Sequence, residues 1–197
     1  MIIWINGAFG SGKTTAAYEL NRRLPNSFVY DPENAGYFIR RNTNGLFAEG
    51  DFQDIPLWRE MNYKTLSMIA EKYDGTIIVP MTIVSPIYYD EIIGKLAADG
   101  HDVKHYILYA KPDEIKRRLK KRSFLFIRNE DFALSAIDRC INAFDKYIPE
   151  VKIYTDNMSI NDVVDRIAKL ASLQLTPNKT TGLGRYLYRK KMTRKHT

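Results

Sequence analysis

Apolar residues gather in short runs along the chain, and the segments between these runs show a helical period. Five of the runs are rich in β-branched and aromatic residues, which predicts strands. The candidate strands lie at residues 2–6, 28–30, 76–81, 103–109 and 151–155. Most of them are too apolar to alternate between two faces, which is typical of strands covered on both sides. The pattern therefore predicts an α/β protein built on a parallel sheet.

In the intervening segments, apolar residues recur every three or four positions, as they do on the buried face of a helix. The clearest series are Ala16, Leu20 and Leu24; Tyr88, Ile92 and Leu96; Ala133, Ile137 and Ile141; and Val163, Ile167 and Leu170. A longer helix is predicted from about residue 56 to residue 73, because proline is tolerated in the first turn. Trp58 lies on the apolar face of this helix, and we expect it to be buried.

Charge is distributed unevenly along the chain. Residues 1–165 contain 21 of the 30 Lys and Arg and all 23 Asp and Glu, which gives −2, whereas residues 166–197 contain the other nine cations and no acid. Because only this end is basic, the net charge of +7 is no argument for a specific nucleic-acid partner. A change of composition near residues 175–182 predicts one domain over 1–175 and a basic tail over 176–197.

The cysteine count and the lengths of the apolar runs indicate the cellular compartment. The single cysteine, Cys140, cannot make an internal disulfide, which suits a reducing compartment. No run of about 18 apolar residues is present to span a bilayer, and the first apolar run is too short for a signal peptide. We therefore expect a cytoplasmic protein.

The first candidate strand leads into the sequence INGAFGSGKTT, residues 5–15. It matches the pattern G-x-x-x-x-G-K-[ST], with the strand before and the helix after that this motif requires. In such a phosphate-binding loop, or P-loop, main-chain N–H groups cradle the phosphates, the lysine reaches the β and γ phosphates, and the hydroxyl binds Mg²⁺. The expected nucleotide contacts are Gly7, Ala8, Phe9, Gly10, Ser11, Gly12, Lys13, Thr14 and Thr15, with Thr14 as the metal ligand.

A P-loop does not by itself distinguish kinases from hydrolases. Many hydrolases carry an acid at the end of the strand beside the P-loop strand, but the best candidate strand ends IIVPMTIV, without a carboxylate. Asp31 follows the strand at 28–30, at the edge where open α/β sheets bind ligands. Its carboxylate suits a proton acceptor for a hydroxyl or a Mg²⁺ ligand. A turn residue before proline is the simpler alternative.

A cationic helix is predicted at residues 111–122, KPDEIKRRLKKR. The apolar run that follows it has no helical face and lies between Arg122 and Arg128. Two interpretations stay open for about residues 118–132. One is a mobile lid whose arginines reach the phosphates and whose apolar groups exclude water. The other is an ordinary loop packed on the core.

Together these motifs resemble the small-molecule kinase branch of P-loop proteins and, more closely, the bacterial tunicamycin-resistance ATP-binding protein family. The shared motifs are MIIWINGAFGSGKT, YDPE with Gly36, DFQ with PLWR, IIVPMTIV with Pro86, EIIG, Arg118–Leu119 with Arg122, IDRC and TDNMSINDV. They run from residue 1 to about residue 163 and so cover most of the predicted domain.

The resemblance implies a P-loop NTPase fold: a five-stranded parallel sheet with helices on both faces and a helical lid, followed here by the basic tail. It implies ATP and Mg²⁺ as cofactors and a role in resistance to tunicamycin, a uridine-containing nucleoside antibiotic. By this analogy Arg118 lies near adenine, Arg122 belongs to the lid, and both act in catalysis with Lys13 and Asp31. Asp156 and Asn157 are then expected beside the base.

The acceptor is expected to bind over residues 31–60, where aromatic and cationic side chains are frequent. Aromatic planes with fixed cations suit a nucleobase or a sugar that carries anionic groups. The expected acceptor contacts are Asp31, Tyr37, Arg40, Gln53 and Arg59. Gln53 is included for its place in the shared motif, and Arg59 because it lies on a different helix face from Trp58.

Several functions stay open on the sequence alone. The first is ATP-dependent phosphoryl transfer to a hydroxyl of a small molecule, such as a nucleoside antibiotic. The second is ATP-dependent binding and sequestration of the drug at the membrane surface without chemistry, and the third is a metabolic nucleoside, nucleotide or small-molecule kinase. The basic tail suits an anionic membrane surface, where each cation adds about 1 kcal/mol, but it also suits nucleic-acid binding or disorder.

Overall fold

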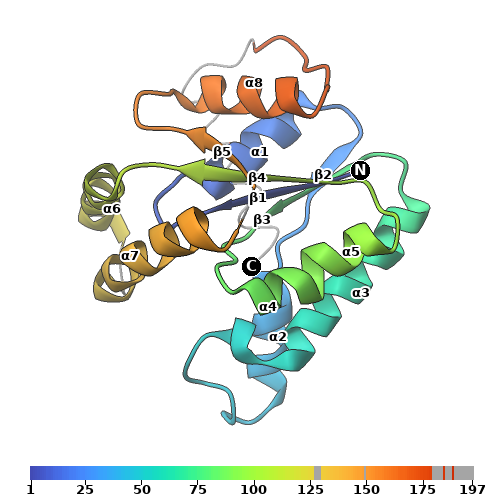
Figure 1. Ribbon diagram of the computed structural model, residues 1–197, viewed down its shortest axis with the longest axis vertical. Coiled ribbons are helices and arrows are strands. Elements are labelled where there is room, and N and C mark those ends of the chain that lie inside the picture. The colour runs from blue at the N-terminus through green and yellow to red at the C-terminus, as the bar shows by residue number, and fades with distance from the viewer. Residues whose placement is uncertain (127–129, 149, 179–183, 185–187, 189–197) are drawn as a thin grey trace.

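The computed structural model describes residues 1–126, 130–148, 150–178, 184 and 188, and the side chains of residues 121–135 lie outside this description. A parallel sheet of five strands forms the centre, in the order β2-β3-β1-β4-β5 (Figure 1). The strands are β1 (Ile2–Gly7), β2 (Ser27–Val29), β3 (Thr76–Pro80), β4 (Val103–Tyr109) and β5 (Val151–Tyr154). The predicted five-stranded parallel α/β sheet is therefore confirmed.

Helices cover both faces of the sheet. They are α1 (Lys13–Arg23), α2 (Glu33–Asn42), α3 (Pro56–Lys72), α4 (Pro86–Tyr89), α5 (Lys95–Ala98), α6 (Pro112–Phe126), α7 (Glu130–Lys146) and α8 (Ile160–Leu170). A short 3₁₀ turn, η1 (Phe52–Asp54), precedes α3, and a π-helical turn, η2 (Asp90–Gly94), joins α4 to α5. In Figure 1, α1 and α8 lie above the sheet, α2, α3, α4 and α5 lie below it, and α6 stands beyond the carboxyl ends of the strands.

Strand β1 shows how the sheet divides the core. Ile3 and Ile5 are fully buried in the cluster that contains the apolar residues of α1 and α8. Ile2 and Trp4, which alternate with them, are equally buried in a second cluster with Trp58 of α3. Since successive strand residues point to opposite faces, continuous apolar runs are the expected sequence of such a strand. The expected burial of Trp58 is confirmed.

Two helices begin with the local features that favour a helix start. Pro56 occupies the first turn of α3, where its missing N–H costs no hydrogen bond. A capping box begins α8: the Ser159 side chain accepts a hydrogen bond from the Asp162 N–H at 3.3 Å, and the Asp162 carboxylate accepts one from the Ser159 N–H at 2.8 Å. Both helices lie within a few residues of their predicted positions.

Helix α2, at Glu33–Asn42, lies in a part of the acceptor segment to which the sequence pattern assigned no helix. Helix α6 continues to Phe126, through the apolar run that had no predicted face, and α7 begins at Glu130. The expected lid at 118–132 thus begins in α6. The side chain of Arg122 and residues 127–129 lie outside the described part of the chain, so the lid interpretation stays a prediction.

No helix within the described residues is both long and apolar enough to cross a membrane.

Candidate nucleotide and acceptor site

The P-loop joins the end of β1 to the start of α1 at the carboxyl edge of the sheet. Gly7, Gly10 and Gly12 have φ angles of 146°, 82° and 100°, a region that favours glycine. At Gly7 a Cβ atom would lie 2.5 Å from the Ser11 Oγ and 2.7 Å from the Leu108 carbonyl oxygen. The sequence requirement for glycine here is therefore both conformational and steric.

Lys13, the first residue of α1, directs its ammonium group back over the loop. Its Nζ donates hydrogen bonds to the carbonyl oxygens of Gly7 at 2.9 Å and Ala8 at 3.0 Å, and it lies 5.6 Å from the centre of the Phe9 ring. Beside it, Thr14 is exposed at the same helix end. A cation and the N–H groups of a helix N-terminus thus meet at one point, which is the arrangement that binds phosphate.

The end of β3 is fastened to the P-loop by neutral side chains. The Asn6 Oδ1 accepts hydrogen bonds from the N–H groups of Gly7 at 2.8 Å and Ile83 at 3.0 Å, and its Nδ2 donates to the Ile83 carbonyl at 2.8 Å. Thr82 Oγ1 donates to the Gly7 carbonyl at 2.8 Å. The strand adjacent to β1 is therefore the one expected, and it contributes a hydroxyl and main-chain groups where many hydrolases have an acid.

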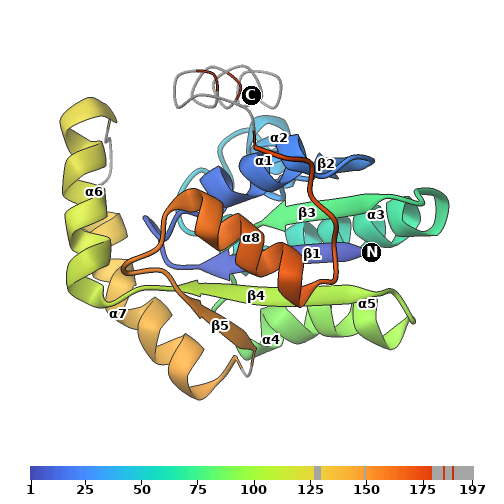
Figure 2. The ribbon, with the colours of Figure 1, turned by 90° about the horizontal axis from the view of Figure 1, so that it is seen from above.

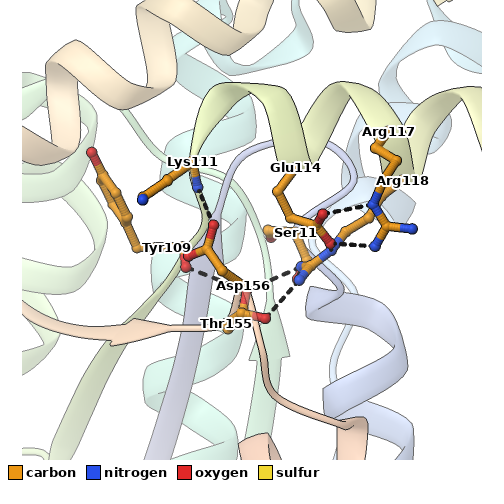
Figure 3. Close-up of polar contacts among 8 residues, drawn as sticks. All are labelled: Ser11, Tyr109, Lys111, Glu114, Arg117, Arg118, Thr155 and Asp156. Carbon is orange, nitrogen blue, oxygen red and sulfur yellow. Dashed lines mark hydrogen bonds and ion pairs between the residues drawn. The ribbon is translucent and has the colours of Figure 1, made fainter.

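Arg118 of α6 joins three segments around the far end of the P-loop (Figure 3). Its guanidinium donates to the Thr155 carbonyl at 2.6 Å, to the Thr155 hydroxyl at 3.0 Å and to the Ser11 carbonyl at 3.4 Å. Glu114, one turn earlier in α6, accepts a further hydrogen bond from it at 2.7 Å. Arg117 and Arg118 together hold the pKa of Glu114 at about 2.

Asp156 and Asn157 follow β5 directly, beside the start of α6. The Asp156 Oδ1 accepts a hydrogen bond from the Lys111 N–H at 3.0 Å, and Asn157 is exposed. Figure 3 shows Asp156 and Arg118 on the two sides of Thr155. Arg118 and Asp156, which the resemblance places near the base, therefore lie next to the same residue, Thr155, and their role at a base stays a prediction.

The acceptor side begins with a pair of carboxylates after β2. The Asp31 Oδ1 accepts a hydrogen bond from the N–H of Glu33 at 3.1 Å, at the start of α2. One turn along the helix, the Tyr37 hydroxyl donates to the Glu33 Oε2 at 3.0 Å. Burial, and then the negative charge of Asp31, raise the pKa of Glu33, while Lys13 opposes this shift through its positive charge. Glu33 therefore lies within electrostatic reach of the P-loop lysine, and Asp31 accepts a hydrogen bond from its N–H.

Glu33 is a candidate functional residue that the sequence analysis did not select. The available signal was its place two residues after Asp31, in the quoted motif YDPE. Its half-buried position beside Tyr37 became visible only in the fold, because the segment had no assigned helix.

Arg40 and Gln53 shape the turn that faces α2. Arg40 donates hydrogen bonds to the carbonyl oxygens of Phe47 at 3.2 Å and Gly50 at 2.6 Å, and its guanidinium lies 5.4 Å from the centre of the Phe52 ring. Gln53 is buried, and its N–H donates to the Asp51 carboxylate at 3.0 Å. Both side chains fix the loop that leads from α2 to α3.

Arg59 is buried, with 8% of its surface exposed. Its guanidinium donates to the Glu91 carboxylate and to the Gln53 carbonyl, and it lies 4.4 Å from the centre of the Tyr88 ring. The positive charge is thus matched within the protein. A direct role for Arg59 at the acceptor remains a prediction.

The residues present fit a Mg²⁺ ion bound with a nucleotide. Hard oxygen ligands suit this ion, which keeps several waters and is held by one or two protein oxygens plus phosphates. The exposed hydroxyl of Thr14 and the carboxylate of Asp31 are oxygen donors of that kind. No group of three or more His, Cys, Asp or Glu able to hold a metal occurs among the described residues.

Comparison with known proteins gives one family. A family model described as "AAA domain" matches residues 2–146. A probable adenylyl-sulfate kinase of Halalkalibacterium halodurans is 25% identical over 175 residues, which cover 84% of this chain and 80% of that protein.

Solved structures agree with this fold. The tunicamycin resistance protein of Deinococcus radiodurans has a TM-score of 0.74 and 29% identity, over 89% of this chain and 98% of that one. A shikimate kinase from Bacteroides thetaiotaomicron has a TM-score of 0.56 and 24% identity, over 88% and 99%, and shows the fold alone. The resemblance to tunicamycin-resistance proteins that the motifs predicted is confirmed as a structural similarity.

Proposed function

Since the chain belongs to the AAA domain family and has the fold of P-loop kinases, we propose that it is an ATP-dependent phosphotransferase that acts on a hydroxyl of a nucleoside antibiotic such as tunicamycin. The observation that carries this proposal is the hydrogen-bonded pair of Asp31 and Glu33 after β2, with Glu33 within electrostatic reach of Lys13. A phosphate-binding cation and a proton acceptor on one sheet edge are the parts that phosphoryl transfer to a hydroxyl needs.

The reaction follows from these positions. The hydroxyl oxygen of the acceptor forms a bond to the γ-phosphorus of ATP, while the bond from that phosphorus to the β,γ-bridging oxygen breaks and ADP leaves with the electron pair. Asp31 accepts the proton of the hydroxyl, and Lys13 stabilises the negative charge on the transferring group. A Mg²⁺ ion held by Thr14 and Asp31 supplies further charge neutralisation when it is bound.

Two features support a kinase-like site over the usual hydrolase arrangement. The end of β3 presents Thr82 in place of an acid, with its hydroxyl bound to the Gly7 carbonyl. The carboxylates instead follow β2, on the side where α2 and η1 form the predicted acceptor segment. An acid in this second position suits the acceptance of a proton from an acceptor hydroxyl.

The proposal is tested by incubating the protein with ATP, Mg²⁺ and tunicamycin and measuring the mass of the drug. We expect the gain of one phosphate with the wild type and with Lys64→Ala, and no gain with Lys13→Ala. Lys64 is a matched control because it is an exposed lysine that pairs with Glu60 of the same helix.

The remaining outcomes separate the alternatives. If tunicamycin binds by calorimetry in the presence of ATP but gains no phosphate at saturation, sequestration is the better account. If it neither binds nor reacts, the acceptor belongs to another class, and a thermal-shift screen of nucleosides and small metabolites with ATP identifies it.

A further inference from the structure

The C-terminal segment does not leave the domain after α8 but returns to α1. The N–H and hydroxyl of Thr176 donate to the Arg23 carbonyl at 2.8 and 3.0 Å. The side-chain oxygen of Asn178 accepts from Arg22 at 2.7 Å, and its Nδ2 donates to Asn161 of α8 at 3.0 Å. Figure 2 shows this part of the chain running from the end of α8 toward α1.

Tyr188, further along the chain, also packs on helix α1. Its hydroxyl donates to the Asn21 Oδ1 at 2.8 Å, and its ring packs against the core cluster that contains Tyr18. Tyr18 is only 3% exposed in this arrangement. A residue from the basic tail thus covers part of α1.

The covered face of α1 leads to the proposed reaction site. Thr14, Tyr18 and Asn21 are four and three residues apart, and such residues share one face of a helix. Thr14 stands at the phosphate end of this face, and Asn21, with Tyr188 bound to it, stands at the other end. Tyr18 lies between them.

Tyr18 is also the link to the acceptor carboxylate. Helix α1 packs beside β2, which ends just before Asp31. Burial, then the charge of Asp31, then Tyr188 raise the pKa of Tyr18 to about 12. Tyr18 shares a core cluster with Val29 of β2, so the side chain that Tyr188 covers packs on the strand that leads into Asp31.

We propose that Tyr188 is a positioning residue of the acceptor site, which docks on Asn21, covers Tyr18 and so fixes the arrangement of Tyr18 and Asp31. Tyr188 thereby becomes part of the acceptor side and affects how well the acceptor is held. This inference rests on the proposed function, in which Asp31 receives the proton of the acceptor hydroxyl.

The first test needs no ligand. Amide hydrogen exchange is measured by mass spectrometry on the full chain, with Tyr188→Ala, Tyr188→Phe and the control Tyr147→Ala. Tyr147 is a suitable control because it is a tyrosine with 59% of its surface exposed, at the end of α7. In the Tyr188→Ala protein we expect residues 28–35 to exchange about tenfold faster than in the wild type, with α6 and α7 unchanged.

The conservative variant separates the hydroxyl from the ring. The Tyr188→Phe protein loses one hydrogen bond, which corresponds to about a fivefold change in an equilibrium constant. The rate of amide exchange of its residues 28–35 should therefore lie between those of the wild type and of Tyr188→Ala. Unchanged exchange of residues 28–35 in Tyr188→Ala, with the thermal midpoint preserved, would overturn the proposal. An equal effect of Tyr147→Ala would overturn it as well.

The second test uses ATP and tunicamycin. Tyr188→Ala should raise the KM for the acceptor about tenfold and leave the KM for ATP within about twofold, because the P-loop and Arg118 are untouched. A proportional loss for both substrates would assign Tyr188 a general structural role. If the wild type transfers no phosphate to tunicamycin, the proposed function fails for that acceptor, while the exchange measurement still decides the role of Tyr188.

Discussion

Arg118 donates a hydrogen bond from its Nη2 to the main-chain carbonyl of Thr155 at 2.6 Å, and so ties α6 to the end of β5. The same guanidinium reaches the Ser11 carbonyl in the P-loop at 3.4 Å. One side chain therefore sets the distance between the segment that binds phosphate and the segment expected beside the base. Since a guanidinium presents several donors in a fixed plane, lysine cannot reproduce these contacts.

We accordingly expect Arg118→Lys to weaken ATP binding by about tenfold, the equivalent of one or two lost hydrogen bonds. The measurement is a titration with a fluorescent ATP analogue. Arg117→Lys is the matched control, because Arg117 also binds Glu114 but lies outward with 66% of its side chain exposed. Its effect should stay within about twofold. Equal losses for the two variants would show that Arg118 acts only through Glu114.

The acceptor carboxylates should affect transfer more than ATP binding. Asp31→Asn keeps an oxygen that can accept from the Glu33 N–H but cannot take a proton. We expect kcat for the drug to fall by about a hundredfold or more, with the dissociation constant for the ATP analogue changed by less than about threefold. The check is steady-state transfer alongside the same nucleotide titration.

A control for this prediction is Asp145→Asn. Asp145 is a surface carboxylate that binds Lys152 of β5 and Tyr109 of β4, at the opposite edge of the sheet from β2. It should leave kcat unchanged within about twofold. Full activity of Asp31→Asn would show that Asp31 is not the proton acceptor. Glu33 would then be the proton acceptor, and Glu33→Gln would be the inactive variant.

The raised pKa of Glu33 gives a dependence of stability on pH with a definite sign. Because burial and Asp31 disfavour the charged form in the folded state, the folded protein holds this proton more tightly than the unfolded chain. The free energy of unfolding therefore decreases as the pH rises through the ordinary glutamate value to the raised one, and this cost persists above it. Glu33→Gln removes the cost.

The measurement is the thermal midpoint of wild type and Glu33→Gln at about pH 4 and about pH 7.5. The variant should gain stability relative to wild type at the higher pH and not at the lower one. Glu60→Gln should show the opposite sign or no effect, because Lys64 lowers the pKa of Glu60. A midpoint difference for Glu33→Gln that is the same at both values contradicts the assigned cause.

Most of the sheet could be predicted from the sequence because strands that are buried on both faces have runs of apolar residues. Strand β4, at Val103–Tyr109, has the bounds that its run predicted. The P-loop was equally visible, since its glycines and Lys13 lie in one short segment. Helix α2 was not visible, because only Gly36 and Ile39 of its ten residues are buried and they form no repeating series.

The site was harder to predict wherever a residue depends on partners far along the chain. Arg59 was selected because it lies on a different helix face from Trp58, but the Glu91 carboxylate that matches its charge lies 32 residues away. Asn6, buried in β1, forms hydrogen bonds through its side chain with the main chain of Ile83, and no local sequence pattern predicts them. The return of Tyr188 to Asn21 spans 167 positions, and the composition break before it read as a linker. Contacts between residues so far apart in the chain depend on the fold and cannot be predicted from local sequence spacing.

The position of η1 depends on a glycine in α2. A Cβ atom at Gly36 would lie 2.6 Å from the Phe52 Cγ and 2.7 Å from Cδ1, so the ring of Phe52 rests directly on the helix backbone. Phe52 in turn contacts Tyr37 and Trp58, with ring centres 6.5 and 5.4 Å away. Gly36→Ala therefore forces Phe52 outward, and overpacking of this kind costs about 1 to 3 kcal/mol.

We expect Gly36→Ala to lower the free energy of unfolding by that amount in a denaturant titration and to raise the acceptor KM, because η1 carries Gln53. Gly94→Ala is the matched control: it is also a helical glycine, but its nearest atom to a Cβ is 3.5 Å away, an ordinary contact. There the gain in helix propensity, up to about 1 kcal/mol, should leave the protein as stable or more stable. If Gly36→Ala proves as well tolerated as Gly94→Ala, Phe52 moves freely and η1 is not held by α2.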